Sequence, residues 1–372
     1  EIAVGNYGGY GNKPMDIDEE VLSYFDAAQI EALPKDLAVL RYDQQELSLE
    51  ARRLRYERCK AATAIWNAAD TNEGRLQALT NFRVDIGADA AGVVELMEPF
   101  LRKDANRLPL TEIELALESL GLRDEHNTVL SPSEKNKLDQ EGYLNLGPLL
   151  NEEQLVAMRR RYDSAIEQDG GKPENVGSIG IGRLVDIVVK PINSDGLLDT
   201  LFLHPRLLAA VRHILGIHFK FIGSNYHCAL PGYGHQGIHA DFLWGVKGKP
   251  LVVNAVWMID EFTTSNGATR VVPGTHRSGL HPTGDLVDGQ PRDLNEVVEG
   301  EIKLTGDAGC CFVYNAHLWH SGTQNCTSKL RRAQHCFFGR SEIPASTDVP
   351  TAIDKDVYAR LGRNERAILD IK

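Results

Sequence analysis

The feature that most constrains the fold is a succession of short β-rich runs in the second half of the chain, separated by turn residues. The runs are rich in β-branched and aromatic residues and cover residues 219–230, 251–259, 269–272, 301–304, 309–314 and 334–338. Several short strands at close spacing are typical of a sandwich or barrel, and the jelly roll is one such architecture. We therefore predict a β sandwich or barrel in this half of the chain.

The first third of the chain has a helical pattern. Over residues 16–123, Ala, Leu, Glu and Arg dominate, and apolar residues recur three and four positions apart. Turn residues follow, and Ser131 is suited to cap a helix whose first turn holds Pro132. These patterns predict an α+β chain with a helical N-terminal domain over 1–130, a β-rich domain over 131–340 and a helical C-terminal extension over 341–372.

The apolar faces of the N-terminal helices must be buried against something. We expect residues 1–130 to contact the β-rich domain and to shape the entrance to its site, with a homodimer through this region as the alternative. A second helix is expected over residues 152–166, followed by a Gly-rich loop over 169–182. Glycines 177, 180 and 182 stand in the wrong order for a dinucleotide-binding turn, so we assign them to the loop.

Composition excludes several classes of partner. The formal net charge of −12 opposes the phosphate neutralisation on which nucleic-acid binding depends. No window of eighteen uninterrupted apolar residues is present, so we expect no membrane span. The six cysteines show no Cys-X-X-Cys spacing, and no basic-then-apolar leader precedes the chain, which together favour reduced thiols in a cytoplasmic protein.

A candidate metal site begins with His239 and Asp241. Residues two apart on an extended strand project from the same face, so one metal ion could meet both side chains. A His-X-Asp pair alone is more often a surface or hydrogen-bonded pair. His320, 81 residues after His239, supplies a second imidazole at the end of an apolar run. Two imidazoles and one carboxylate leave coordination positions open, as iron(II) oxygenases require for a cosubstrate and O₂.

A candidate anion-binding residue follows the last histidine of this set. Arg331 stands eleven residues after His320, at the start of the next β-rich run. A guanidinium there could bind a carboxylate through two parallel hydrogen bonds, which a lysine would do less specifically.

Three ordered motifs resemble the phytanoyl-CoA dioxygenase family. They are His239-X-Asp241, the run Asn-Gly-Ala-Thr-Arg-Val-Val-Pro-Gly-Thr-His over 266–276, and the segment from His320-Ser-Gly through Asn325 to Arg331-Arg-Ala. The resemblance covers residues 130–339, including Gly-Tyr-Leu at 142–144, and leaves out the N-terminal third and the last thirty residues. It implies a double-stranded β-helix (jelly roll, cupin-like) and a non-haem iron(II) enzyme that uses 2-oxoglutarate and O₂.

The resemblance also implies roles for single residues. His239, Asp241 and His320 would be the iron ligands, and Arg331 would bind the distal carboxylate of 2-oxoglutarate. The sequence departs from many relatives at Ala240, where they carry glutamine between the two ligands.

Several further residues are candidates for the cosubstrate or substrate pocket. Asn225 and Asn254 are expected on strands before and after the His-X-Asp segment and could bind 2-oxoglutarate, although each could equally be an ordinary strand residue. Trp244, His227 and Arg183 are candidates for substrate contacts. Trp257 is more consistent with plain core.

Three other histidines and one long segment are further candidates for functional roles. His317 and His235 lie close to the ligand positions, but neither has a downstream arginine at the family spacing, so loop or supporting roles are favoured. His276 ends the Pro-Gly-Thr-His turn and is expected to organise it. The segment 281–300 could be a lid or only a connection.

The predicted function is the oxidation of an unactivated C–H bond of a small organic molecule, by hydroxylation as the default and in secondary metabolism as one setting. Desaturation or ring formation is open to the same chemistry, whereas halogenation is disfavoured because Asp241 fills the position that a halide would need. Two other classes stay open at this point. One is a cupin-like metal-dependent isomerase or hydrolase, which would not need Arg331, and the other is a non-catalytic binding protein on the same fold.

Overall fold

The computed structural model describes residues 49–69, 71, 74, 108–168, 181–241, 246, 248–341, 343 and 349–372. The helices of this part are α3 Leu49–Ala68, α6 Leu110–Ser119, α7 Pro132–Glu141, α8 Glu152–Gln168, α9 Thr200–Leu203, α10 Pro205–Leu215, α11 Val349–Ala352, α12 Lys355–Arg360 and α13 Arg363–Ile368, with short 3₁₀ turns at η3 Ile187–Val189, η4 Pro191–Asn193, η5 Thr275–Arg277 and η6 Pro282–Gly284. The strands are β1 Tyr143–Pro148, β2 Ile181–Val185, β3 Phe219–Ala229, β4 Val252–Met258, β5 Thr269–Val272, β6 Leu286–Val287, β7 Gln290–Pro291, β8 Ile302–Lys303, β9 Cys310–Asn315, β10 Trp319–Gly322 and β11 Arg331–Arg340.

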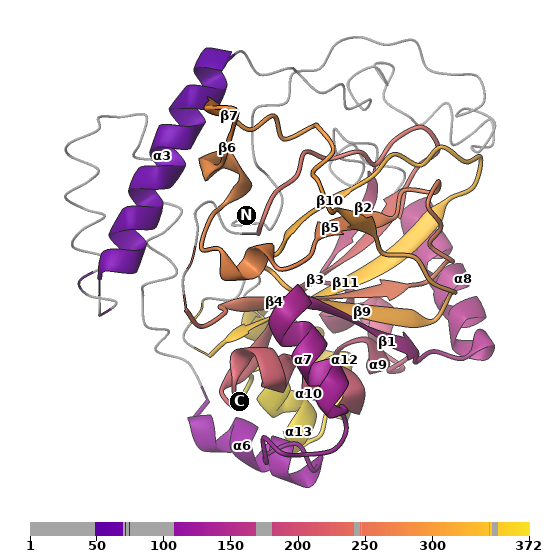
Figure 1. Ribbon diagram of the computed structural model, residues 1–372. Helices are drawn as coiled ribbons and strands as arrows, with labels where there is room; N and C mark the ends of the chain where they lie inside the picture. Colours follow the sequence, from indigo (N-terminus) through magenta and orange to yellow (C-terminus); the bar gives the residue numbers. More distant parts are fainter. Residues whose placement is uncertain are drawn as a thin grey trace.

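Two antiparallel sheets build the centre of the molecule. The large sheet has the order β1-β9-β4-β11-β3-β2, and the small sheet has the order β10-β5-β8. Figure 1 shows α9 and α10 below the large sheet and β5 and β10 above it. The mixed helical and antiparallel architecture agrees with the expected α+β class.

The central strands of the large sheet are buried on both faces. Along β4, Ala255 and Trp257 belong to a core shared with the helices, whereas Val256 and Met258 belong to a second core that includes Val271 of the small sheet. This alternation follows from the two-residue period of a strand. It means that every second residue of the central strands faces the space between the sheets, where a site can be built.

The connection before the large sheet confirms the predicted helix start. The Ser131 hydroxyl accepts a hydrogen bond from the backbone N–H of Glu134, and the Glu134 side chain accepts one from the backbone N–H of Ser131. The helix α7 ends at Gly142, whose φ of 84° is in the left-handed region. The side chain of His276 packs against Gly142 and leaves no room for a Cβ, which ties the Pro-Gly-Thr-His turn to the end of this helix.

Part of the N-terminal third shares the core of the β-rich domain. Ile113 and Leu117 of α6 are buried in the core that includes the helix-facing side of the large sheet, and α6 packs against α13. The helix α3 contacts the segment that contains η6 and β7. The division near residue 130 and the homodimer stay predictions.

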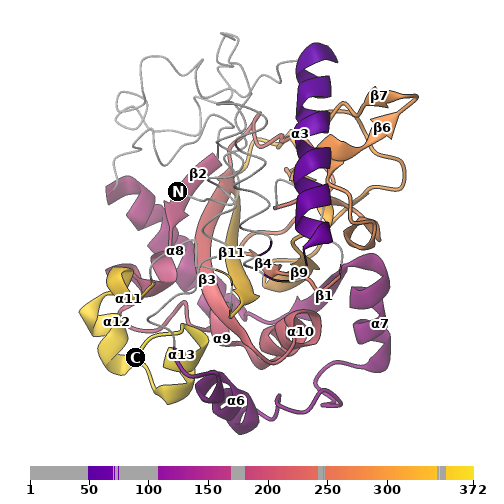
Figure 2. The ribbon, with the colours of Figure 1, turned by 90° about the vertical axis from the view of Figure 1, so that its left-hand side faces the viewer.

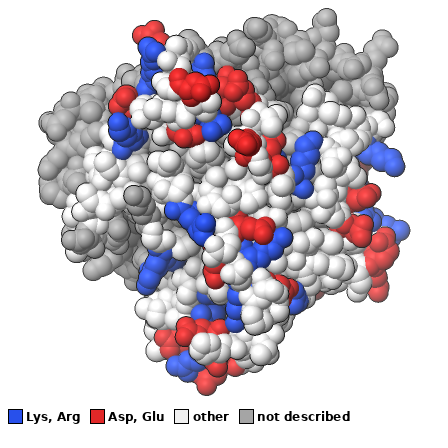
Figure 3. All heavy atoms as spheres, in the orientation of Figure 1, with Lys and Arg blue, Asp and Glu red and all other residues white. Residues whose placement is uncertain are grey.

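The cysteines, the hydropathy of the helices and the surface charge are further properties of the described residues. The six cysteines are free thiols, and five of them are buried. No helix in the described ranges has both the length and the hydropathy to cross a bilayer. On the face shown in Figure 3, acidic and basic side chains are interspersed.

Candidate metal centre between the two sheets

Backbone pairing brings the two candidate ligand histidines together. The N–H of His239 donates to the carbonyl of His320 at 2.9 Å, and the N–H of His320 donates to the carbonyl of His239 at 2.8 Å. Because β10, which contains His320, also pairs with β5, this bridge attaches the His-X-Asp segment to the small sheet. The N–H of Asp241 donates to the carbonyl of Ala316 at 2.9 Å, so a third backbone bond fixes the carboxylate-bearing residue.

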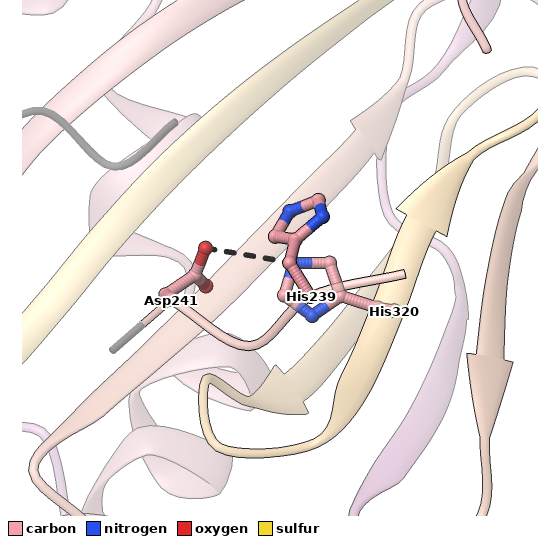
Figure 4. A group of neighbouring side chains, drawn as sticks. All are labelled: His239, Asp241 and His320. Atoms are coloured by element: carbon pink, nitrogen blue, oxygen red, sulfur yellow. Dashed lines mark ion pairs between the residues drawn. The ribbon is translucent and has the colours of Figure 1, made fainter. Parts of the chain in front are cut away.

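The three side chains converge on one point (Figure 4). One nitrogen or oxygen atom from each of His239, Asp241 and His320 lies within 4.8 Å of the others, and His320 Nε2 is 3.5 Å from Asp241 Oδ1. This is the only cluster of three or more such side chains in the described part of the chain that could hold a metal ion.

Both imidazoles are oriented through their other ring nitrogen. His239 Nδ1 lies 2.8 Å from the carbonyl of Gly237, and His320 Nδ1 lies 2.8 Å from the carbonyl of Leu318. A carbonyl oxygen only accepts hydrogen bonds, so Nδ1 carries the proton in each ring. Nε2 of each neutral ring is therefore a lone-pair donor available to a metal, which is the usual arrangement of metal-binding histidines.

Burial and mutual attraction set the charges of the three side chains. Burial, with a smaller effect of the nearby His320, lowers the pKa of His239 to about 4. Burial alone would raise the pKa of Asp241, but its neighbours, with His320 foremost, outweigh burial and lower it. Burial would lower the pKa of His320, but the Asp241 carboxylate and the Leu318 carbonyl outweigh burial and raise it. At neutral pH the site thus has an ionised carboxylate and a neutral His239.

Asn254 contacts the metal site through Asp241. Its side-chain amide donates to Asp241 Oδ2 and lies 3.2 Å from the hydroxyl of Tyr314, while its own Oδ1 is buried with no hydrogen-bond partner. The sequence suggested Asn254 for 2-oxoglutarate. The structure shows its amide on the candidate iron ligand instead, with only Oδ1 left to accept a further hydrogen bond.

Arg331 lies on the face of the large sheet that points toward the small sheet. Two residues further along β11, Ala333 belongs to the core between the sheets. The guanidinium is buried, donates to the carbonyl of Gly267 at 2.8 Å and lies 4.4 Å above the ring of Phe262. Burial lowers the pKa of Arg331 to about 10, so the group stays cationic at neutral pH. Its Nε has no partner among the described residues, so the cation retains an unused donor.

Strand register places Asn225 and His227 on the same face as Arg331. Asn225 pairs with His335 and His227 pairs with Ala333 across the β3 and β11 strands. The rings of His227 and His335 lie 4.4 Å apart. His335 is not among the residues predicted from the sequence, although its distance of four residues from Arg331 on one strand places both on the same face.

The structure assigns a role to only one of the three remaining pocket candidates. Trp257 faces the helical layer and donates from its indole to the carbonyl of Leu201 at 2.8 Å, which confirms that it is a core residue. Arg183 pairs with His227 through its strand, but its side chain is outside the described part of the structure. Trp244 also lies outside the described residues.

Two of the other histidines near the motifs have supporting contacts. His317 is buried, and its Nε2 accepts a hydrogen bond from the backbone N–H of Leu251 at 3.2 Å. His276 Nε2 lies 3.2 Å from the carbonyl of Asp139. The ring atom Nε2 of His235 is buried with no hydrogen-bond partner among the described residues.

The donor set defines the class of the centre. Two imidazoles and one carboxylate that leave open positions are the set found in non-haem iron(II) oxygenases. Residues 138–333 match the phytanoyl-CoA dioxygenase (PhyH) family, which is just over half of the 372 residues. The chain therefore belongs to the PhyH family, and the expected class of iron(II)- and 2-oxoglutarate-dependent dioxygenases is confirmed.

Relatives of known sequence agree with this assignment. An uncharacterized protein of Mycobacterium tuberculosis is 27% identical over 63% of this chain and 84% of its own. The dioxygenase FUM3 of Gibberella moniliformis is 29% identical over 37% of this chain and 45% of its own. The Fe(II)/2-oxoglutarate-dependent dioxygenase nvfF of Aspergillus novofumigatus is 28% identical over 35% of this chain and 42% of its own. The chain thus spans less than half of the length of these two named dioxygenases.

Solved structures include a distant neighbour. The crystal structure of HygX from Streptomyces hygroscopicus, with nickel and 2-oxoglutarate bound, is 16% identical, covers 58% of this chain and 89% of its own, and has a TM-score of 0.47.

Proposed function

We propose that the protein oxidises an unactivated C–H bond of a small organic molecule, with hydroxylation as the default outcome. The observation that carries the proposal is the convergence of His239, Asp241 and His320, with both Nε2 atoms left available. In the proposed reaction, 2-oxoglutarate loses CO₂ to give succinate, one oxygen atom of O₂ enters the succinate and the other enters the C–H bond. Iron(II), held by these three side chains, would supply the site at which 2-oxoglutarate and O₂ react.

The fit of iron(II) rests on the donor chemistry of the chain. Imidazole nitrogen and carboxylate oxygen suit iron(II), and each donor is already oriented by a neighbouring group. Asp241 is held by the Asn254 amide, and the two imidazoles are held by backbone carbonyls. The retained carboxylate at position 241 also supports oxygen insertion over halogenation, which needs a position left open for a halide.

The fit of 2-oxoglutarate rests on Arg331. A buried guanidinium with an unused Nε, on the face of the large sheet shared by Asn254, is a suitable partner for the distal carboxylate of a dicarboxylate. Phe262 and the Gly267 carbonyl fix the plane of the guanidinium, which favours directional binding. The proposal includes Asn225 as a second polar group of this pocket, since it is buried on the same face.

The two sheets are proposed to be the halves of a double-stranded β-helix. Both are antiparallel, and a shared core that includes Val256, Met258 and Val271 lies between them. Such a core beside the metal site would exclude water from it, and this would protect the oxidising chemistry from side reactions.

The test is anaerobic loading of the full chain with iron(II) and 2-oxoglutarate, followed by exposure to O₂ with a library of acyl thioesters, amino acids and secondary metabolites. A compound that stimulates succinate release and gains one oxygen atom would support the proposal. Turnover of a compound without consumption of 2-oxoglutarate would instead indicate an isomerase or hydrolase. A protein that binds neither iron(II) nor 2-oxoglutarate would refute it.

A further inference from the structure

The segment 280–294, which we call the brace, contacts the residues that precede His320 and His239 at its first and last residues. The carbonyl of Leu280 accepts a hydrogen bond from the indole N–H of Trp319 at 2.9 Å. The carbonyl of Leu294 accepts one from the backbone N–H of Ile238 at 2.7 Å. Because these donors immediately precede His320 and His239, the ends of the brace are fixed beside both candidate ligand histidines.

A third contact reaches the residue between His239 and Asp241. His281 is 4% exposed, and its Nδ1 accepts a hydrogen bond from the N–H of Thr283 at 3.2 Å and lies 2.6 Å from the Thr283 hydroxyl. A ring that accepts at Nδ1 carries its proton at Nε2 when neutral. Its Nε2 lies 3.4 Å from the carbonyl of Ala240, so the imidazole donates to the turn that carries two candidate ligands.

The opposite side of the brace is held by α3, and both views of the ribbon show this helix beside β6 and β7 (Figures 1 and 2). The Arg52 guanidinium donates to the carbonyl of Pro291 at 3.1 Å, and the Arg53 guanidinium donates to the side-chain carbonyl of Gln290 at 3.0 Å. Cys59 packs so closely on Gly284 that a Cβ there would lie 3.2 Å from its sulfur. The helix thus contacts the brace at both η6 and β7.

We infer that His281 is a positioning residue of the metal centre, and that α3 sets its place through the brace. Ala240 lies between two ligands, so a donor fixed on its carbonyl restricts the orientation of the peptide that joins them. His281 is not one of the three side chains that form the candidate metal site. The inference rests on the proposed function, because it concerns the same three ligands.

The first test compares His281→Phe with His281→Gln in the full chain. Both keep a large side chain, but only glutamine retains a group that can donate to the Ala240 carbonyl. Removal of a supporting contact around a metal typically weakens metal binding by about 10-fold or more. We therefore expect about that loss of Mn(II) affinity in His281→Phe, partial recovery in His281→Gln and unchanged thermal unfolding of both metal-free proteins. A folded His281→Phe protein with wild-type Mn(II) affinity would overturn the inference.

A more conservative variant keeps the inference testable if His281→Phe does not fold. Thr283→Val removes only the hydroxyl beside His281 Nδ1, and we expect a smaller loss of Mn(II) affinity, of a few-fold. An unchanged affinity in Thr283→Val together with an unchanged affinity in His281→Gln would contradict a role for this contact. Failure of the wild-type protein to bind any divalent ion would refute the proposed function instead, so the two failures are distinguishable.

The second test addresses the helix. The double variant Arg52→Ala, Arg53→Ala removes the two side-chain hydrogen bonds to the brace, whereas Lys60→Ala removes a cation of α3 that contacts Tyr56 of the same helix. We expect Mn(II) affinity to fall a few-fold in the double variant and to stay at the wild-type level in Lys60→Ala. Equal affinities in the two variants would show that α3 does not act on the metal centre.

Discussion

The side-chain amide of Asn254 donates a hydrogen bond to the Asp241 carboxylate and connects the metal site to the middle of the large sheet. Asn254 is 1% exposed, so water does not readily replace this contact. The amide thereby fixes which carboxylate oxygen is left for a metal ion, and the large sheet becomes part of the metal site although it supplies no ligand.

Asn254→Ala should therefore weaken metal binding without removing a ligand. Loss of a group that orients a ligand typically costs about 10-fold or more in affinity. A titration with Mn(II) would measure this change. Tyr314→Phe is the matched control, since it removes the hydroxyl that Asn254 also contacts but keeps the hydrogen bond to Asp241. Equal losses in the two variants would contradict the assignment of the effect to the Asp241 contact.

His239→Ala, Asp241→Ala and His320→Ala should each abolish iron(II) binding or turnover, because two ligands from the protein are too few for a stable site. Bound iron per chain after dialysis is the measurement. His317→Ala serves as the control, because this buried imidazole bonds to the Leu251 backbone and not to the metal cluster. Full activity in the His320 variant with loss in the His317 variant would show that the ligand assignment is wrong.

Arg331→Ala should raise the 2-oxoglutarate concentration needed for turnover far more than it changes iron affinity. Removal of one partner of a buried charged contact costs about 2–5 kcal/mol. Arg331→Lys, which keeps the charge but not the paired donors, should lie between the wild-type and alanine proteins. Arg332→Lys is the control, because the Arg332 side chain bonds to Asp163 and Asp260 and not to the residues around Arg331. Unchanged 2-oxoglutarate dependence in Arg331→Ala would remove the main support for this cosubstrate.

The metal-free protein should lose stability as the pH falls from about 6.5 toward 4. Burial lowers the pKa of His317 to about 4, whereas the unfolded value is near 6.5, so acid protonates the unfolded chain first. The stabilising effect of the neutral ring is complete above pH 6.5 and is lost as the pH falls to 4. Between pH 7 and 5 this histidine should account for roughly 2 kcal/mol. Urea unfolding of the wild-type protein and of His317→Gln at pH 7 and pH 5 measures this effect. If the free energy of unfolding changed equally between the two pH values in both proteins, the prediction would be wrong.

The positions of several strands along the chain could be predicted from composition, because β-branched and aromatic runs mark β3, β4, β5, β9 and β11. The strand β10 was not predicted. Its sequence Trp319-His-Ser-Gly has little strand propensity, and the strand exists because it pairs with β5. The strand β2 starts at Ile181, inside the expected Gly-rich loop, and pairs with β3.

The candidate ligands and Arg331 could be selected from the sequence because spacing along the chain carries that information. The roles of Asn254 and His281 could not, because each depends on a side-chain contact with the His239–Asp241 segment that the fold creates and that no spacing rule predicts. His335 was accessible in principle from strand alternation, but nothing in its local sequence distinguishes it from a core residue. Supporting residues of a metal site are therefore harder to predict than its ligands.

The pair of main-chain hydrogen bonds between His239 and His320 gives the site a property that does not depend on the metal. The separation of the two imidazoles is set by peptide geometry, so little conformational entropy has to be lost when an ion binds. Replacing one divalent ion by another then leaves the backbone in place. The amide protons of both histidines should therefore exchange with solvent equally slowly in the metal-free and the metal-loaded protein. Such a result would mean that the geometry of the centre is preorganised and is not induced by the bound ion.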